Sequence, residues 1–176
     1  MKSRIFSVLA LCLLISTTGF AQNKKAVNLD EQIKLNGKVR TGKLANGLTY
    51  YVRANNKPAN RAEFQIAVNA GSVLEEANEV GLAHFTEHMG FNGTKHYPGN
   101  TMIDDLEKEG IVFGREINAY TGFDQTVYMV TLPTDNARLF DMGLKILDGW
   151  ASGMLMTGEE IDKERGVIIE EWRMSQ

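Results

Sequence analysis

Two histidines and a glutamate in the segment "GLAHFTEHMGFNGT", residues 81–94, constrain this chain more than any other feature. His84, Glu87 and His88 stand at positions i, i+3 and i+4, which share one face only when the segment is an α-helix. We therefore expect a helix over residues 80–91 that presents all three side chains on the same side.

The residue types on this face are those of a metal centre. Two imidazoles four residues apart can hold one Zn²⁺ at about 2.0–2.1 Å from each ring nitrogen. Because bound zinc lowers the pKa of water to about 7, Glu87 is placed to take a proton from that water. The order His-x-x-Glu-His is typical of inverzincins. The alternative, two ordinary histidines beside a solvated glutamate, does not explain a general base between them, so we predict one zinc per chain.

A catalytic zinc also needs a third protein ligand, often a glutamate, and a helix expected over residues 157–176 contains several. At about 100° per residue, Glu164 and Glu171 fall together beside the apolar stripe, whereas Glu170 points away. This reasoning leaves Glu171 or Glu164 as the candidate ligand, and two surface charges as the alternative. The stripe itself is formed by Ile161, Ile168 and Trp172.

The remaining patterns predict an α+β domain. Alternating apolar residues and an Asn46–Gly47 turn predict strands within residues 39–55, 61–71 and 115–133. Amphipathic patterns predict helices over residues 99–110, 134–153 and 157–176, the last opened by a capping box of Thr157 and Glu160. The apolar residues of the second of these helices are Leu139, Met142, Leu144, Ile146 and Leu147. We expect a mixed, mainly antiparallel sheet with helices packed on one face.

The first 21 residues have the layout of a signal peptide. A positively charged start precedes an apolar run that is shorter than the ~20 residues of a membrane span, and Gly19 and Ala21 mark a cleavage site after Ala21. Leu11 before Cys12 does not fit a lipoprotein signal. We expect an exported bacterial protein, periplasmic or secreted, without a stable membrane anchor after cleavage. Its mature form would contain no cysteine, and hence no disulfide, thiolate metal site or cysteine nucleophile.

The rest of the chain is expected to comprise a polar extension, residues 22–38, and one domain, residues 39–176. Hydrophobic residues make up 43% and charged residues 23%, which is typical of a globular protein. A net charge of -3 indicates no basic surface, so nucleic acid is not an expected partner.

Three segments resemble the pitrilysin/insulysin family of zinc peptidases, the inverzincins, which includes mitochondrial processing peptidases and bacterial periplasmic peptidases. They are "EVGLAHFTEHMGFNGT", "ERGVIIEEWR" and "GREINAYTGFDQTVYMV". The resemblance covers residues 39–176 and implies the N-terminal catalytic domain of that family. It implies that Glu171 is the third zinc ligand and that Glu164 supports the site. It also implies an edge strand that pairs with extended peptide substrates, formed by Asn118, Ala119, Tyr120 and Thr121.

The resulting prediction is a zinc metalloendopeptidase domain, truncated relative to a multidomain enzyme. His84, His88 and Glu171 would hold zinc, Glu87 would act as general base and later protonate the leaving amine, and Glu164 would orient a ligand. Expected partners are a peptide or small protein as substrate and a second homologous domain or subunit. The alternative is a half-enzyme partner that binds zinc and peptide but needs a second domain or chain for activity. A zinc-storage protein is disfavoured because the chain has no histidine-rich tract.

Overall fold

The computed structural model describes residues 29–174, which divide into two compact units with the boundary between Arg53 and Ala54. The predicted signal peptide, residues 1–21, lies outside the described residues, as does the first part of the predicted extension. Within residues 29–174, no helix combines the length and the apolar character that crossing a membrane requires.

The described part of the first unit contains a β-hairpin. Strands β1 (Val39–Lys43) and β2 (Thr49–Arg53) pair in antiparallel register. Gly47 takes a positive φ of 93°, and the Asn46 side chain accepts a hydrogen bond from the Leu48 amide at 3.1 Å. The turn chemistry of Asn-Gly thus closes the hairpin, as the sequence predicted.

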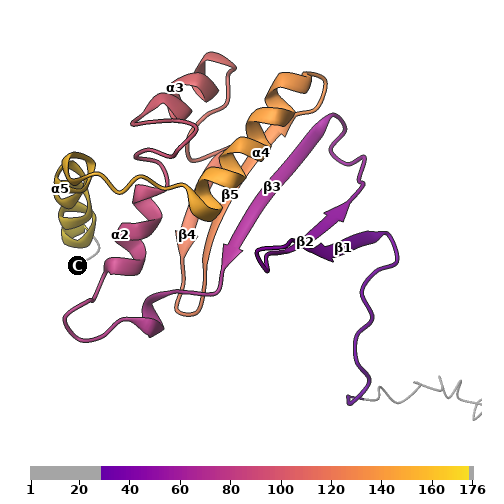
Figure 1. Cartoon of the computed structure of the whole chain (residues 1–176), viewed down its shortest axis with the longest axis horizontal. Helices are drawn as coiled ribbons and strands as arrows, with labels where there is room; N and C mark the ends of the chain where they lie inside the picture. The colour runs from indigo at the N-terminus through magenta and orange to yellow at the C-terminus, as the bar shows by residue number, and fades with distance from the viewer. Residues whose placement is uncertain (1–28, 175–176) are drawn as a thin grey trace, which may run out of the picture. The chain divides into compact units, whose positions relative to one another are not determined.

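The second unit is built on an antiparallel sheet with the strand order β3-β5-β4 (Figure 1). The strands are β3 (Arg61–Val68), β4 (Ile117–Thr121) and β5 (Thr126–Pro133). Alternation along them directs one set of side chains to the helix-covered face, where the core forms. That set includes Phe64, Ile117, Tyr128, Val130 and Leu132.

This unit also contains helices, which together with the sheet confirm the predicted α+β class. They are the short 3₁₀ turn η1 (Ser72–Leu74), α2 (Leu82–Met89), α3 (Thr101–Lys108), α4 (Ala137–Ser152) and α5 (Gly158–Met174). Figure 1 shows α4 lying along β3 and β5, whereas α2 lies between β4 and α5. Helix α2 therefore joins the sheet to the last helix of the chain.

Two expectations about helix faces need correction. Leu144, counted in the apolar pattern of α4, is 50% exposed, whereas Met142 and Ile146 on the same helix are buried. Trp172 was predicted to face inward with Ile161 and Ile168, yet it is 63% exposed. The reason is that α5 packs mainly on α2 within residues 29–174, so only a narrow strip of its surface is covered.

The N-terminus of helix α2 is capped by a carboxylate from the preceding loop. Gly81, the residue before the helix, has a φ of 95° and no side chain with which to cap it. The two carboxylate oxygens of Glu75 instead accept hydrogen bonds from the Gly81 amide at 2.9 Å and the Ala83 amide at 2.7 Å. A negative charge at this end also complements the helix dipole.

The other end of α2 is held by two aromatic side chains. The Gly90 amide donates to the Glu87 carbonyl at 3.0 Å and not to the Thr86 carbonyl, four residues back, which an α-helix would use. The Thr86 carbonyl instead accepts a hydrogen bond from the Tyr128 hydroxyl at 3.3 Å. Burial raises the pKa of Tyr128 well above its ordinary value, which keeps this hydroxyl a donor. The Trp150 indole donates to the Gly90 carbonyl at 2.9 Å. Both ends of α2 are thus fixed by side chains from other parts of the fold.

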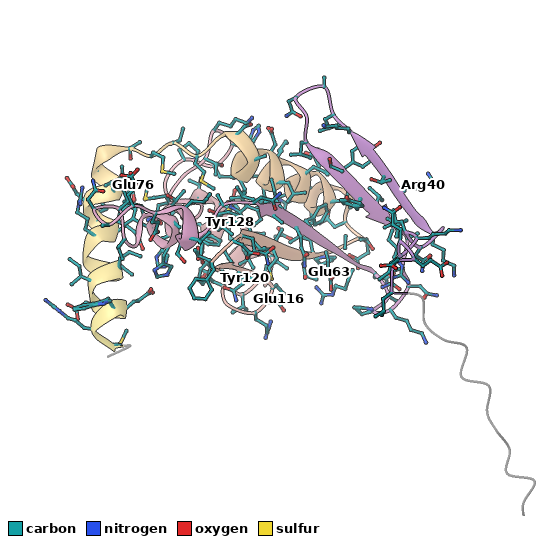
Figure 2. All side chains as sticks on the ribbon, turned by 90° about the horizontal axis from the view of Figure 1, so that it is seen from below. Arg40, Glu63, Glu76, Glu116, Tyr120 and Tyr128 are labelled. Atoms are coloured by element: carbon teal, nitrogen blue, oxygen red, sulfur yellow. The ribbon has the colours of Figure 1, made fainter. Side chains whose placement is uncertain are left out.

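Replacing Glu75 by alanine should lower the free energy of unfolding by about 1–3 kcal/mol, because two helix-end amides lose a charged acceptor. Urea unfolding followed by circular dichroism measures this change. The neighbouring Glu76, which is exposed and labelled in Figure 2, provides the control. Glu76→Ala should stay within about 0.5 kcal/mol of the unsubstituted protein. Equal losses in both variants would contradict the capping role.

Candidate metal centre

Three predicted ligand residues come together between α2 and α5. His84 and His88 lie on α2 and Glu171 lies on α5, and one ligand atom from each falls within 4.8 Å of the others. The two imidazole Nε2 atoms are 3.1 Å apart. The Glu171 carboxylate lies 3.4 Å from Nε2 of His88 and 3.6 Å from Nε2 of His84.

These separations suit a zinc ion. Ligand atoms about 2.0–2.2 Å from one tetrahedral zinc stand about 3.3–3.6 Å from each other. The three measured distances, 3.1, 3.4 and 3.6 Å, lie close to that range. The His84 and Glu171 side chains are 43% and 40% exposed, so one side of the site is open to solvent. An open side is what a catalytic zinc needs, whereas a structural zinc is enclosed by protein ligands.

Glu170, the neighbour of Glu171, points to solvent and not toward the two histidines. It is exposed and forms an ion pair with Arg173 one helical turn later. In contrast, Glu164 and Glu171 are both half-buried, two turns apart on the side of α5 that meets α2. The helical phase argued from the sequence therefore separates these glutamates in the way the structure does.

Glu164 contacts His88 and does not join the three candidate ligand atoms. Its Oε1 is 2.7 Å from Nδ1 of His88, the ring nitrogen on the opposite side from the candidate metal position. An ionised carboxylate can only accept a hydrogen bond, so a neutral His88 paired with it would donate from Nδ1 and keep the lone pair of Nε2 for a metal. The Asn92 side chain binds the other oxygen of Glu164.

Glu87 is the buried member of the His-x-x-Glu-His motif. It is 8% exposed, and its Oε2 accepts a hydrogen bond from the Thr121 hydroxyl at 2.6 Å. Thr121 is the last residue of β4, so this contact joins the sheet to α2. Burial and the hydroxyl donor restrict the movement of this carboxylate on the helix face that carries the histidines.

The four residues predicted to bind substrate lie on β4 but do not share one face. The side chains of Ala119 and Thr121 turn toward the helices, as their contacts with the core and with Glu87 indicate. Asn118 and Tyr120 turn to the opposite face and are exposed. Figure 2 labels Tyr120 and Tyr128, which come from the neighbouring strands β4 and β5. Among residues 29–174, β5 is the one strand of the sheet that pairs with β4. On the other edge of β4, an isolated bridge joins Ile117 to Phe113, and the strand residues after Ile117 have no strand partner.

Three residues that support the site were not singled out from the sequence for this role. Glu75 and Tyr128 anchor α2, and Asn92 binds Glu164. Tyr128 and Asn92 make contacts with residues far apart in the chain, which no local pattern indicates. Glu75 lies six and eight residues before the two amides that it binds, a spacing that does not correspond to a local capping motif. The third histidine, His96, lies outside the site and pairs with Asp148 at 2.6 Å.

Comparisons with known proteins identify relatives of this chain. The family model described as Insulinase (Peptidase family M16) matches residues 50–176. The "Probable zinc protease PqqL" of Escherichia coli is 45% identical over 139 residues, which cover 79% of this chain and 15% of that protein. The "Zinc protease PQQL-like" of Arabidopsis thaliana is 42% identical over 132 residues, or 75% of this chain and 14% of that protein. The chain thus spans less than a fifth of either relative.

A solved structure extends the likeness to three dimensions. The crystal structure of the first half of the periplasmic protease PqqL from Escherichia coli superimposes with a TM-score of 0.77 at 43% identity, covering 82% of this chain and 31% of that one. Because the family match runs through the three-stranded sheet, α2 and α5 alike, this chain belongs to the insulinase family of peptidases, M16, as its sequence segments had predicted.

Proposed function

We propose that this chain carries the zinc-binding and catalytic residues of a metalloendopeptidase that cleaves extended peptides. The observation that supports this most is the convergence of His84, His88 and Glu171 within 4.8 Å, on a helix face that also bears the buried carboxylate Glu87. The kinship with proteins named as zinc proteases points the same way.

The proposed chemistry assigns separate tasks to the ligands and to Glu87. When bound, zinc would supply a Lewis acid that polarises the scissile carbonyl and acidifies water. Glu87 would take the proton from the attacking water and later deliver it to the leaving amine. The hydrogen bond from Thr121 supports this role, because it restrains the carboxylate of Glu87 at one oxygen. Glu164 would hold His88 in the orientation and tautomer that binding requires.

The substrate would bind as an additional strand on the open edge of β4. An extended peptide can pair with exposed main-chain amides and carbonyls there, largely independently of its sequence. The exposed Asn118 and Tyr120 are the side chains of this strand that could contact such a peptide from the face away from the helices.

We also propose export and a partner. The signal-like residues 1–21 and the periplasmic setting named for PqqL favour a periplasmic or secreted protein. A second homologous domain or subunit is supported by the description of the solved relative as the first half of a protease. The half-enzyme alternative differs only in whether this partner is needed for activity.

The ligand assignment predicts how zinc binding responds to substitution. Glu171→Gln should weaken zinc binding by more than about 100-fold, because loss of a direct ligand exceeds the 10–100-fold effect typical of outer contacts. Competition of the purified protein with a chromophoric chelator measures the dissociation constant. Glu170→Gln, one residue away and paired with Arg173, is the matched control and should leave binding unchanged. The reverse pattern would refute the assignment of Glu171.

The general-base assignment predicts a separation of activity from metal content. Glu87→Gln should reduce hydrolysis of a fluorogenic peptide by about 10²- to 10⁴-fold while one zinc per chain remains bound. Thr86→Ala alters the exposed neighbour of Glu87 and should retain nearly full activity. A Glu87→Gln protein that loses less than half of its activity, measured with its zinc content verified, would rule out this role.

A further inference from the structure

Asn92 follows α2 by three residues and reaches across to α5. Its side-chain amide donates to Oε2 of Glu164 at 2.5 Å, while Oε1 of the same carboxylate is 2.7 Å from Nδ1 of His88. The three side chains therefore form a chain of hydrogen bonds that ends at a candidate zinc ligand.

Glu164 needs both of these partners. Its side chain is only 13% exposed, so its carboxylate is largely removed from water, and each oxygen requires a donor from the protein. A glutamate held at one oxygen can still rotate its carboxylate, whereas bonds at both oxygens fix its plane. The orientation of the His88 imidazole depends on that plane.

The side chain of Asn92 is not needed for the local backbone. The turn after α2 is closed by the Asn92 main-chain amide, which donates to the Met89 carbonyl at 3.2 Å. Any residue except proline can make that bond. The amide group of the side chain is therefore available for Glu164 alone, which separates a role at the site from a role in ending the helix.

From these contacts we infer that Asn92 is a positioning residue of the metal centre. It holds the Glu164 carboxylate, which in turn holds His88 with Nε2 directed at the metal. His88 is the better-covered histidine of the pair, with 18% of its side chain exposed against 43% for His84, so the protein determines its orientation more closely. This inference rests on the zinc centre proposed above and adds to it a residue that touches neither metal nor substrate.

A double-mutant cycle on the purified protein tests the inference, with the zinc dissociation constant measured by chelator competition. Asn92→Ala should weaken zinc binding by about 10- to 100-fold, the range typical of outer contacts at metal sites. In a Glu164→Ala background the same substitution should change the constant less than twofold, because Asn92 acts through Glu164. Asn100→Ala is the matched control, since Asn100 also donates to a carboxylate, Asp104, but both of these residues are exposed. It should leave zinc binding unchanged.

A second readout is the visible absorption of the protein loaded with Co²⁺, which reports the ligand geometry. Asn92→Ala should alter this spectrum in the same direction as Glu164→Ala.

The outcomes separate the inference from the proposal on which it rests. Failure of the unsubstituted protein to bind zinc would overturn the proposed centre itself. If that protein binds zinc but Asn92→Ala binds it within twofold as tightly, only the role of Asn92 is refuted. An equal loss in the Glu164→Ala background, or unfolding of metal-free Asn92→Ala but not of Glu164→Ala, would assign Asn92 a structural role and refute the inference too.

Discussion

Helix α2 has only eight residues, and the position of the candidate metal centre depends on how that helix is held. Isolated helices shorter than about 12–15 residues are marginal in water, so α2 requires tertiary support. Glu75 supplies it at the first turn, and Tyr128 and Trp150 supply it at the last. These anchors come from the loop before α2, from the sheet and from α4. They fix both the start and the end of the helix that presents His84 and His88.

The second constraint is the packing of α5 against α2. Helix geometry alone places His84, Glu87 and His88 on one face, but it does not determine how far that face lies from Glu171. The contact between the helices does so, with the carboxylate 3.4 Å from His88 and 3.6 Å from His84. Glu164 lies at the same contact, where its bond to His88 is shielded from water. Ligand convergence and ligand orientation thus arise from one interface.

Strand β4 connects the sheet to the centre. Because side chains alternate along a strand, Thr121 can reach Glu87 on the helix side while Asn118 and Tyr120 face away. The main-chain amides and carbonyls of β4 lie in the plane of the sheet, so a peptide could pair with its edge without displacing the side chains on either face. In the proposed enzyme, β4 would therefore contact the general base through Thr121 and also pair with the peptide. This double role would place the scissile bond near the candidate zinc ligands.

The sequence by itself determined the features that depend on local spacing. The i, i+3, i+4 motif indicated α2 and the common face of His84, Glu87 and His88. The Asn46–Gly47 turn indicated the hairpin, and the helical period of α5 separated Glu171 from Glu170. Only the tertiary structure decided which long-range contacts form. Trp172 lies exposed although the pattern placed it inward, and the contacts of Thr121 and Asn92 follow from packing between distant segments. Periodicity specifies the direction of a side chain around its own helix or strand, but not which element lies opposite it.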